Sequence, residues 1–273
     1  MEYIKLTFAY IKKRFSLLAL LVIVPALLLS ISNYPTDIFS FLWNFESMAD
    51  KGFWAILGSV SQMHFSFKIL LYALCYLVFL ASISAVFGIV DRDLRFGEFT
   101  TRHIIAKINE NILIAFRLFI LFFLILEINA IIIAAFATLW LKIFSPAVAL
   151  IFTMVIILML AVVVSCLIPA LVLWVPIMCT TGLSTFKSLA KAMIEGRNNF
   201  GKVLFACIMP IIPCIIVFFA EIFIPLWVAM LINLVVFAFM IIYFTVLAFV
   251  SYYSIEGIER EDEKRQSIWG RGE

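Results

Sequence analysis

The sequence predicts an all-α, polytopic membrane protein with six transmembrane helices and two amphipathic helices at the cytoplasmic surface. Two observations support this fold class: 66% of the residues are hydrophobic and only 14% are charged, and the apolar residues gather in six long runs. A soluble domain is about half apolar and a quarter charged, because its surface faces water. The excess of apolar side chains needs lipid as its solvent, which excludes a soluble globular domain.

Each apolar run can cross the hydrocarbon core of a bilayer, which takes about 20 residues in a helix. Helices are expected because backbone polar groups must be satisfied within lipid and the alternating strands of a barrel are absent from the sequence. The first run has a basic start but no cleavage motif of small residues, so we interpret it as a retained helix. The predicted spans are 15–31, 69–90, 117–141, 147–175, 203–224 and 226–250, and 251–273 is expected to be a charged cytoplasmic tail.

The distribution of lysine and arginine orients these spans. With the N-terminus in the cytoplasm, seventeen of the twenty basic residues fall on the inner side, and only Lys51, Lys68 and Lys142 fall outside. Cytoplasmic loops of membrane proteins carry such an excess of basic residues. Both termini are therefore predicted to be cytoplasmic. The outer segment from Ser32 to Lys68 is rich in Phe and Trp; we expect it to lie on the membrane or cap the bundle, rather than form a binding lid.

The stretch "SLAKAMIEGRNNFGKVLF", residues 188–205, contains most of the second predicted amphipathic helix and the start of the next apolar run. The apolar stripe of this helix is Phe186, Leu189, Ala190, Met193 and Ile194, and its polar face carries Lys187, Ser188, Lys191 and Glu195. We expect Ser184 to be the N-cap and the residues after Gly196 to end the helix. A helix too short to span, with lysines on its polar face, is expected in the anionic inner interface.

The preceding cytoplasmic loop, "FGEFTTRHIIAKINENILIAF", repeats this plan. Arg102 and Lys107 lie on its polar side, and Asn109 to Asn111 are predicted to end the helix. An offset of 88 residues places Asn111 over Asn199. Both copies enter and leave the cytoplasm in the same order, so the predicted repeat is parallel, about an axis along the membrane normal, and not inverted.

This pattern of a small-residue-rich span, a Gly-x-Phe or Gly-x-Ser entry, an amphipathic helix and "GRNNFGKVL" resembles a group of bacterial integral membrane proteins. They are related to the membrane domain that precedes the catalytic barrel of some glycerophosphodiester phosphodiesterases. The resemblance covers residues 77–222 and implies a six-helix domain of the bacterial plasma membrane whose role is mostly uncharacterised. We expect the catalytic barrel to be absent, so no phosphodiesterase residue is carried over.

Glu127 stands out because it lies about 15 Å along the third span, near the bilayer midplane. An ionisable group there costs at least about 2.5 kcal/mol and normally faces the bundle interior. One hypothesis is an intramembrane polar site of Glu127, Asn129 and Asn233 that relays protons or cations or contacts a polar substrate. The favoured alternative is structural: a protonated carboxyl hydrogen-bonded to Asn233, Ser165 or Thr153.

Other features point to packing. Pro169, Pro210 and Pro213 could form a hinge or a cavity, although membrane helices often carry proline without such a role. In "ASISAVFG", Ala81 with Ala85 and Ser84 with Gly88 form a stripe of small residues for close helix contact. No metal-ligand spacing, phosphate-binding loop or serine nucleophile motif occurs, so we predict no cofactor, no metal and no enzyme activity.

Three function classes follow. The favoured one is a non-catalytic membrane domain that organises partner proteins or lipids. The second is a small transporter or permease component that uses Glu127, and the third, least favoured, is an intramembrane enzyme. The expected partners are the lipid bilayer and either a protein partner or a second copy of the chain, but not nucleic acid.

Overall fold

The computed structural model describes residues 2–32, 41–61, 69–97, 104–220 and 224–258, and within these ranges the chain is helical with no β-strand. The all-α fold class is confirmed. Five helices, α1, α5, α6, α8 and α9, are long and apolar enough to cross a membrane, so the chain is a multi-pass membrane protein. The elements are α1 (Glu2–Ser32), η1 (Phe45–Met48), α3 (Phe53–Val60), α4 (Ile69–Phe96), α5 (Ile104–Ile143), α6 (Pro146–Thr181), α7 (Thr185–Asn198), α8 (Phe200–Ala220) and α9 (Leu226–Glu256).

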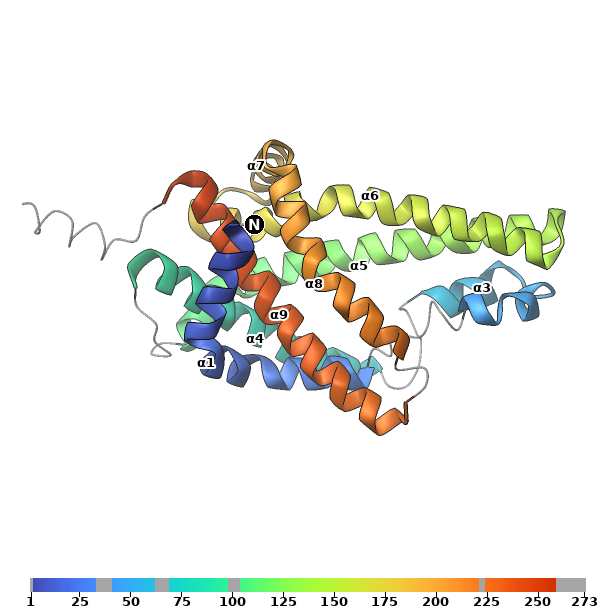
Figure 1. The fold of residues 1–273 in the computed structure, drawn as a ribbon, viewed down its shortest axis with the longest axis horizontal. Coiled ribbons are helices and arrows are strands. Elements are labelled where there is room, and N and C mark those ends of the chain that lie inside the picture. The colour runs from blue at the N-terminus through green and yellow to red at the C-terminus, as the bar shows by residue number, and fades with distance from the viewer. Residues whose placement is uncertain (1, 33–40, 62–68, 98–103, 221–223, 259–273) are drawn as a thin grey trace, which may run out of the picture.

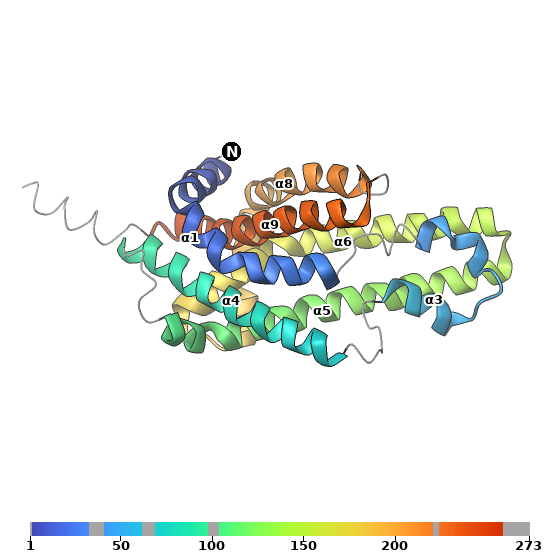
Figure 2. The ribbon, with the colours of Figure 1, turned by 90° about the horizontal axis from the view of Figure 1, so that it is seen from below.

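The helices form a bundle from which one long hairpin projects (Figure 1). α1 packs mainly on α9 and α4, and α6 joins them at the centre. The main core lies where these helices meet and includes Leu18, Phe87, Leu173, Tyr243 and Leu247. α5 has 40 residues and α6 has 36, which gives lengths of about 60 and 54 Å. The α5–α6 hairpin therefore exceeds the hydrocarbon thickness of about 30 Å, and it extends past α8 and α9 in both views (Figures 1 and 2).

The described part of the outer segment, residues 41–61, packs against the far end of this hairpin. Phe41, Phe45 and Ile56 are buried with Ile133 and Ala137 of α5 in a second hydrophobic core, and α3 runs beside α5 (Figure 1). The segment is therefore fastened to the hairpin by its aromatic side chains, whereas its own Trp43 and Trp54 are exposed.

One predicted element is wrong. The sequence places a helix end at Asn109 to Asn111, but α5 runs without a break from Ile104 to Ile143. The buried amide of Asn111 donates its Nδ2 hydrogen to the carbonyl oxygen of Lys107, four residues earlier in the same helix, at 3.0 Å. Asparagine here supports the helix instead of ending it, so the first cytoplasmic amphipathic stretch is the beginning of a spanning helix and not a separate one.

The predicted stripe of small residues on α4 is confirmed as a close helix contact. Ser84 and Ala85 are buried. A Cβ atom added to Gly88 would lie 2.9 Å from the Cβ atom of Lys107 on α5. α4 and α5 can approach this closely only because glycine has no side chain.

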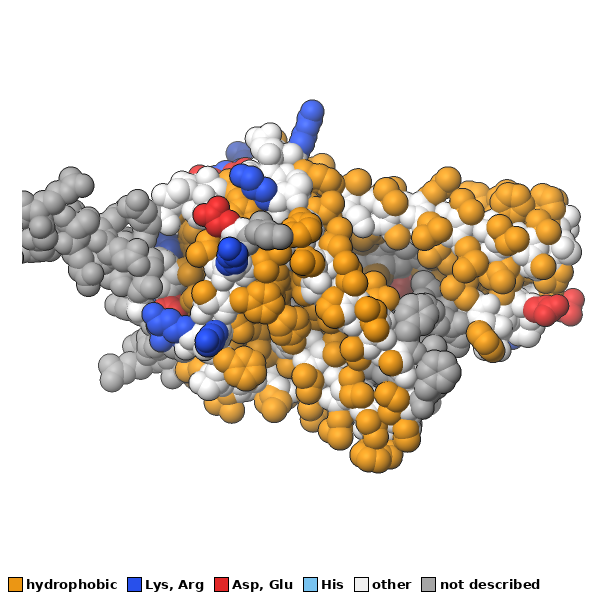
Figure 3. Space-filling model, in the orientation of Figure 1, with side chains coloured by type: hydrophobic (Ala, Val, Ile, Leu, Met, Phe, Trp, Pro, Cys, Tyr) orange, Lys and Arg blue, Asp and Glu red, His pale blue; other side chains and the backbone are white. Residues whose placement is uncertain are grey.

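Polar and apolar side chains separate along the molecule. Apolar side chains cover the visible face of the α5–α6 hairpin, α8 and α9, whereas Lys and Arg gather at the opposite end, over α1 and α7 (Figure 3). We call this the basic end of the bundle; it comprises residues 2–14 of α1, 91–96 of α4, α7 and 250–258 at the end of α9.

Candidate functional site

At the basic end, α1 is joined to α4 by an ion pair with two hydrogen bonds. Arg14 donates from Nε to Asp93 Oδ2 and from Nη2 to Asp93 Oδ1, both at 3.0 Å. The Asp93 side chain is 2% exposed and that of Arg14 is 23% exposed. A bidentate guanidinium–carboxylate pair is both strong and specific in geometry, so it fixes the angle between the two helices.

A second polar contact joins α9 to α4. The hydroxyl of Tyr253 donates to Asp91 Oδ1, and Arg95 Nη1 lies 3.9 Å from Asp91 Oδ2. Burial raises the pKa of Asp91, while the hydrogen bond from Tyr253 and the charge of Arg95 act in the opposite direction. Asp91 and Asp93 thus hold the end of α9 and the start of α1 against the same turns of α4.

α7 packs on α6 through a face of small residues. Ser188, Ala192 and Gly196, spaced four residues apart, are all buried, and Trp174 of α6 donates its Nε1 hydrogen to Ser188 Oγ at 2.9 Å. A Cβ atom added to Gly196 would lie 2.9 Å from the backbone nitrogen of Ala170. Small side chains on this face allow the two backbones to approach closely.

An ion pair ties α7 to the end of α9. Lys191 Nζ lies 2.7 Å from Glu256 Oε1 on α9 and 3.3 Å from Glu195 Oε1 on its own helix, and 5.8 Å from the centre of the Tyr252 ring. The hydrogen bond to Glu256 raises the pKa of Lys191, so the lysine stays charged. Lys191, predicted as a membrane-surface residue, therefore also connects two helices.

The large apolar side chains of α7 point away from the protein. Phe186 is 85% exposed and Ile194 is 63% exposed, with Met193 also exposed between them. These three residues belong to the predicted apolar stripe. The stripe does not pack on α6, because the face of small residues does. An exposed apolar face of this kind at the basic end needs an apolar environment outside the chain.

The other predicted surface lysines and arginines have different outcomes. Lys187 is exposed. Lys107 is only 4% exposed, so its prediction as a surface residue is wrong, because it lies against Gly88 where α4 and α5 meet. Arg102 lies outside the described residues. Asn111, which is hydrogen-bonded to the Lys107 carbonyl, also accepts the thiol hydrogen of Cys179 on α6, with 3.5 Å between Sγ and Oδ1.

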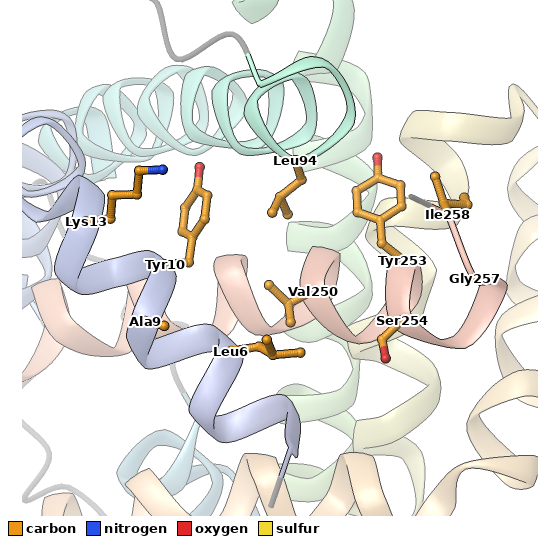
Figure 4. Close-up of a pocket in the computed structure, with 10 residues that line it drawn as sticks. All are labelled: Leu6, Ala9, Tyr10, Lys13, Leu94, Val250, Tyr253, Ser254, Gly257 and Ile258. Atoms are coloured by element: carbon orange, nitrogen blue, oxygen red, sulfur yellow. The ribbon is translucent and has the colours of Figure 1, made fainter. Parts of the chain in front are cut away.

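A groove of about 560 Å³ opens between α1, α4 and α9 at the basic end. Its apolar wall includes Leu6 and Leu94 with Val250 and Ile258. In Figure 4 the ammonium of Lys13 and the hydroxyls of Tyr10 and Tyr253 lie on the side of the groove nearer α4. The groove thus combines an apolar wall with a cationic edge.

The predicted intramembrane residues lie on two helices. Glu127 and Asn129 are on α5, and Asn233 is buried on α9. Ser61, directly after α3, donates its hydroxyl to Glu127 Oε2 at 2.7 Å, and Asn129 donates its side-chain amide to the Ile125 carbonyl at 2.8 Å. The sequence did not indicate Ser61 as a partner, because it belongs to the outer segment.

The partners suggested for Glu127 on α6 make other bonds. The hydroxyls of Thr153 and Ser165 donate to carbonyls of their own helix, those of Ala149 and Ala161.

The three prolines lie within helices that stay continuous. Pro169 is inside α6, together with Pro176, and Pro210 and Pro213 are inside α8. Pro169 is buried, and its carbonyl carbon would lie 3.2 Å from a Cβ atom on Gly196. Pro169 therefore lies at the contact between α6 and α7.

Asp91, Asp93 and Tyr253, which hold α4 to its neighbours at the basic end, were not among the residues indicated by the sequence. The signal was present in "DRDLR", residues 91–95, where two carboxylates alternate with basic residues directly after an apolar run. Membrane orientation depends on the basic residues, so it gave these carboxylates no predicted role. Their helical spacing alone does not show which neighbouring helix they face.

Within the described ranges, no group of three or more His, Cys, Asp or Glu side chains is placed to hold a metal ion. The chain matches no protein-family model, no curated protein and no solved structure. The resemblance to membrane domains of glycerophosphodiester phosphodiesterases therefore stays a sequence-based expectation.

Proposed function

We propose that this protein is a non-catalytic domain of the bacterial plasma membrane that organises lipids or partner proteins at the cytoplasmic surface. In this proposal α4 spans the membrane in addition to α1, α5, α6, α8 and α9, which makes six spans. The basic end faces the cytoplasm together with both termini, and α7 lies in the inner membrane interface. The excess of Lys and Arg on one side supports this orientation.

The observation that carries the proposal is the outward apolar face of α7. Phe186 and Ile194 are exposed while Ser188, Ala192 and Gly196 face α6. A helix held to the protein by its small face and presenting large apolar side chains next to lysines suits contact with acyl chains and anionic headgroups. This arrangement favours lipid over a protein as the principal partner.

The test is the lipid composition around the protein. The full chain is extracted from its membrane in polymer-bounded discs without detergent, and the co-extracted lipids are quantified by mass spectrometry against the whole membrane. We expect anionic phospholipids to be enriched, and an unrelated polytopic protein from the same membrane is the control. A lipid composition equal to that of the whole membrane would refute the lipid-organising role.

A transporter or permease component is the second candidate, and the contact between Ser61 and Glu127 favours it. A carboxyl that accepts a hydroxyl hydrogen bond from the outer segment could exchange a proton or contact a cation. For a transporter, Glu127→Gln should abolish a proton- or cation-dependent flux in vesicles while expression stays intact. If Glu127 is structural, this change should be nearly silent, and Glu127→Leu should lower thermal stability in detergent because the Ser61 hydroxyl loses its acceptor.

A further inference from the structure

We infer that the groove between α1, α4 and α9 binds an anionic phospholipid, with the phosphate at Lys13 and an acyl chain along the apolar wall. This inference rests on the proposed lipid-organising function and assigns it a site. The groove volume of about 560 Å³ lies within the range of about 300–1,000 Å³ typical of ligand sites.

The charge of Lys13 is available to a ligand because the neighbouring carboxylates already have partners. Asp93 accepts both hydrogen bonds from Arg14, and Asp91 accepts one from Tyr253. Glu256, at the end of α9, is held by Lys191. Among the described residues, the structure shows no ion pair for Lys13, and the remaining acidic group of α1, Glu2, is at the exposed start of that helix.

The walls of the groove favour a lipid over a small soluble anion. Leu6 of α1 and Ile258, just after α9, line the groove as exposed apolar side chains, and Val250 lines it as a buried one. Soluble phosphate would gain nothing from these surfaces, whereas an acyl chain gains roughly 25 cal/mol for each Å² of apolar surface removed from water. In the proposed orientation the groove also opens at the depth of the inner-leaflet headgroups, where Lys and Arg attract anionic lipids.

The experiment is native mass spectrometry of the full chain in detergent, titrated with phosphatidylglycerol and, separately, with phosphatidylcholine. We expect phosphatidylglycerol to be retained in preference. Lys13→Gln should weaken its binding about fivefold, the effect of one basic residue at a membrane surface. Lys51→Gln removes an exposed lysine from the outer segment, at the opposite end of the molecule from the groove, and is the matched control that should bind as the parent does.

A second variant tests the groove without changing its charge. Ala9 is exposed on α1 and lines the groove, so Ala9→Trp should fill the space and abolish phosphatidylglycerol retention while the melting temperature stays near that of the parent. Equal losses for Lys13→Gln and Lys51→Gln, or full retention by Ala9→Trp, would overturn the inference. A dimer of the chain that Ala9→Trp dissociates would also overturn it, because the groove would then bind a second copy. Lipid binding that requires removal of residues 259–273 would overturn it as well, because the groove would then bind the tail.

The two proposals fail differently. If anionic lipids are enriched in the polymer-bounded discs of the parent and of Ala9→Trp alike, the groove is not the site, and the lipid-organising function remains. If no disc shows enrichment, the function itself is refuted.

Discussion

Gly196→Ala should lift α7 from α6. The added Cβ atom would lie 2.9 Å from the backbone nitrogen of Ala170, 3.0 Å from its Cα atom and 3.2 Å from the carbonyl carbon of Pro169. All three are backbone atoms of α6, so no side chain can rotate to make room. Relief requires a shift of one whole helix, because a normal carbon contact is about 3.5–4.0 Å.

The size of the effect follows from two opposing contributions. Overpacking of this kind costs about 1–3 kcal/mol, whereas replacing a helical glycine by alanine favours the helix by up to about 1 kcal/mol. Gly201→Ala in α8 is the matched control, since nothing lies within 4 Å of the added atom there. The difference in unfolding free energy between the two variants should therefore be about 1–3 kcal/mol, with Gly196→Ala the less stable.

Two measurements check this. Thermal unfolding in detergent compares the two alanine variants, and maleimide labelling of an Ala192→Cys reporter, buried between α7 and α6, reports whether α7 has moved. We expect faster labelling in the Gly196→Ala background. Equal stability of the two variants together with unchanged labelling would refute the close contact that seats α7.

Two further predictions concern the carboxylates of α4. Asp93→Ala leaves Arg14 without its buried partner; breaking such a pair costs about 3–5 kcal/mol, and we expect the lower end because Arg14 is partly exposed. The variant is compared by thermal unfolding in detergent with Lys12→Ala, a control on α1 near Arg14. A loss of unfolding free energy below about 1 kcal/mol for Asp93→Ala would argue against a stabilising pair between Arg14 and Asp93. Burial raises the pKa of Asp91 above its ordinary 3.8, so the stability it contributes is fully present below pH 3.8 and is lost as the pH rises through the raised value. Asp91→Asn should flatten that part of the stability–pH profile; an unchanged profile would contradict the assignment.

The sequence was most informative where one physical requirement dominates. The need to cover about 30 Å of hydrocarbon with apolar side chains indicated the apolar runs that lie within α1, α5, α6, α8 and α9, five helices long and apolar enough to cross a membrane. The start of α7 was also predictable: Ser184 is its N-cap, and its backbone carbonyl accepts the first helical hydrogen bond, from Ser188.

The sequence failed where the outcome depends on which helices meet. The same residue type ends one helix and continues another: Asn199 is the C-cap of α7, whereas Asn111 lies inside α5 beside Gly88. The apolar stripe of α7 was identified, but its direction was not, since Ser188 finds a buried partner in Trp174 only through tertiary packing. Local periodicity contains no information about such partners.

The boundary of the tail shows the same limit. The sequence ends the last span at residue 250, yet α9 continues to Glu256, and Tyr252 and Tyr253 are buried. Tyr252 lies beside Thr180 of α6 and Lys191 of α7, whereas Tyr253 donates its hydroxyl to Asp91 of α4. Polar residues just past an apolar run therefore belong to the bundle here rather than to solvent.

The proposed function requires the basic end to face the cytoplasm, and cysteine labelling in intact cells measures that orientation. Lys187 and Lys51 are exposed at opposite ends of the molecule, on α7 and in the outer segment; Ser188 is unsuitable because it is buried. With a membrane-impermeant maleimide and the parent chain as control, Lys51→Cys should label in intact cells and Lys187→Cys only after permeabilisation. Labelling of Lys187→Cys in intact cells would place the basic end outside and contradict the account.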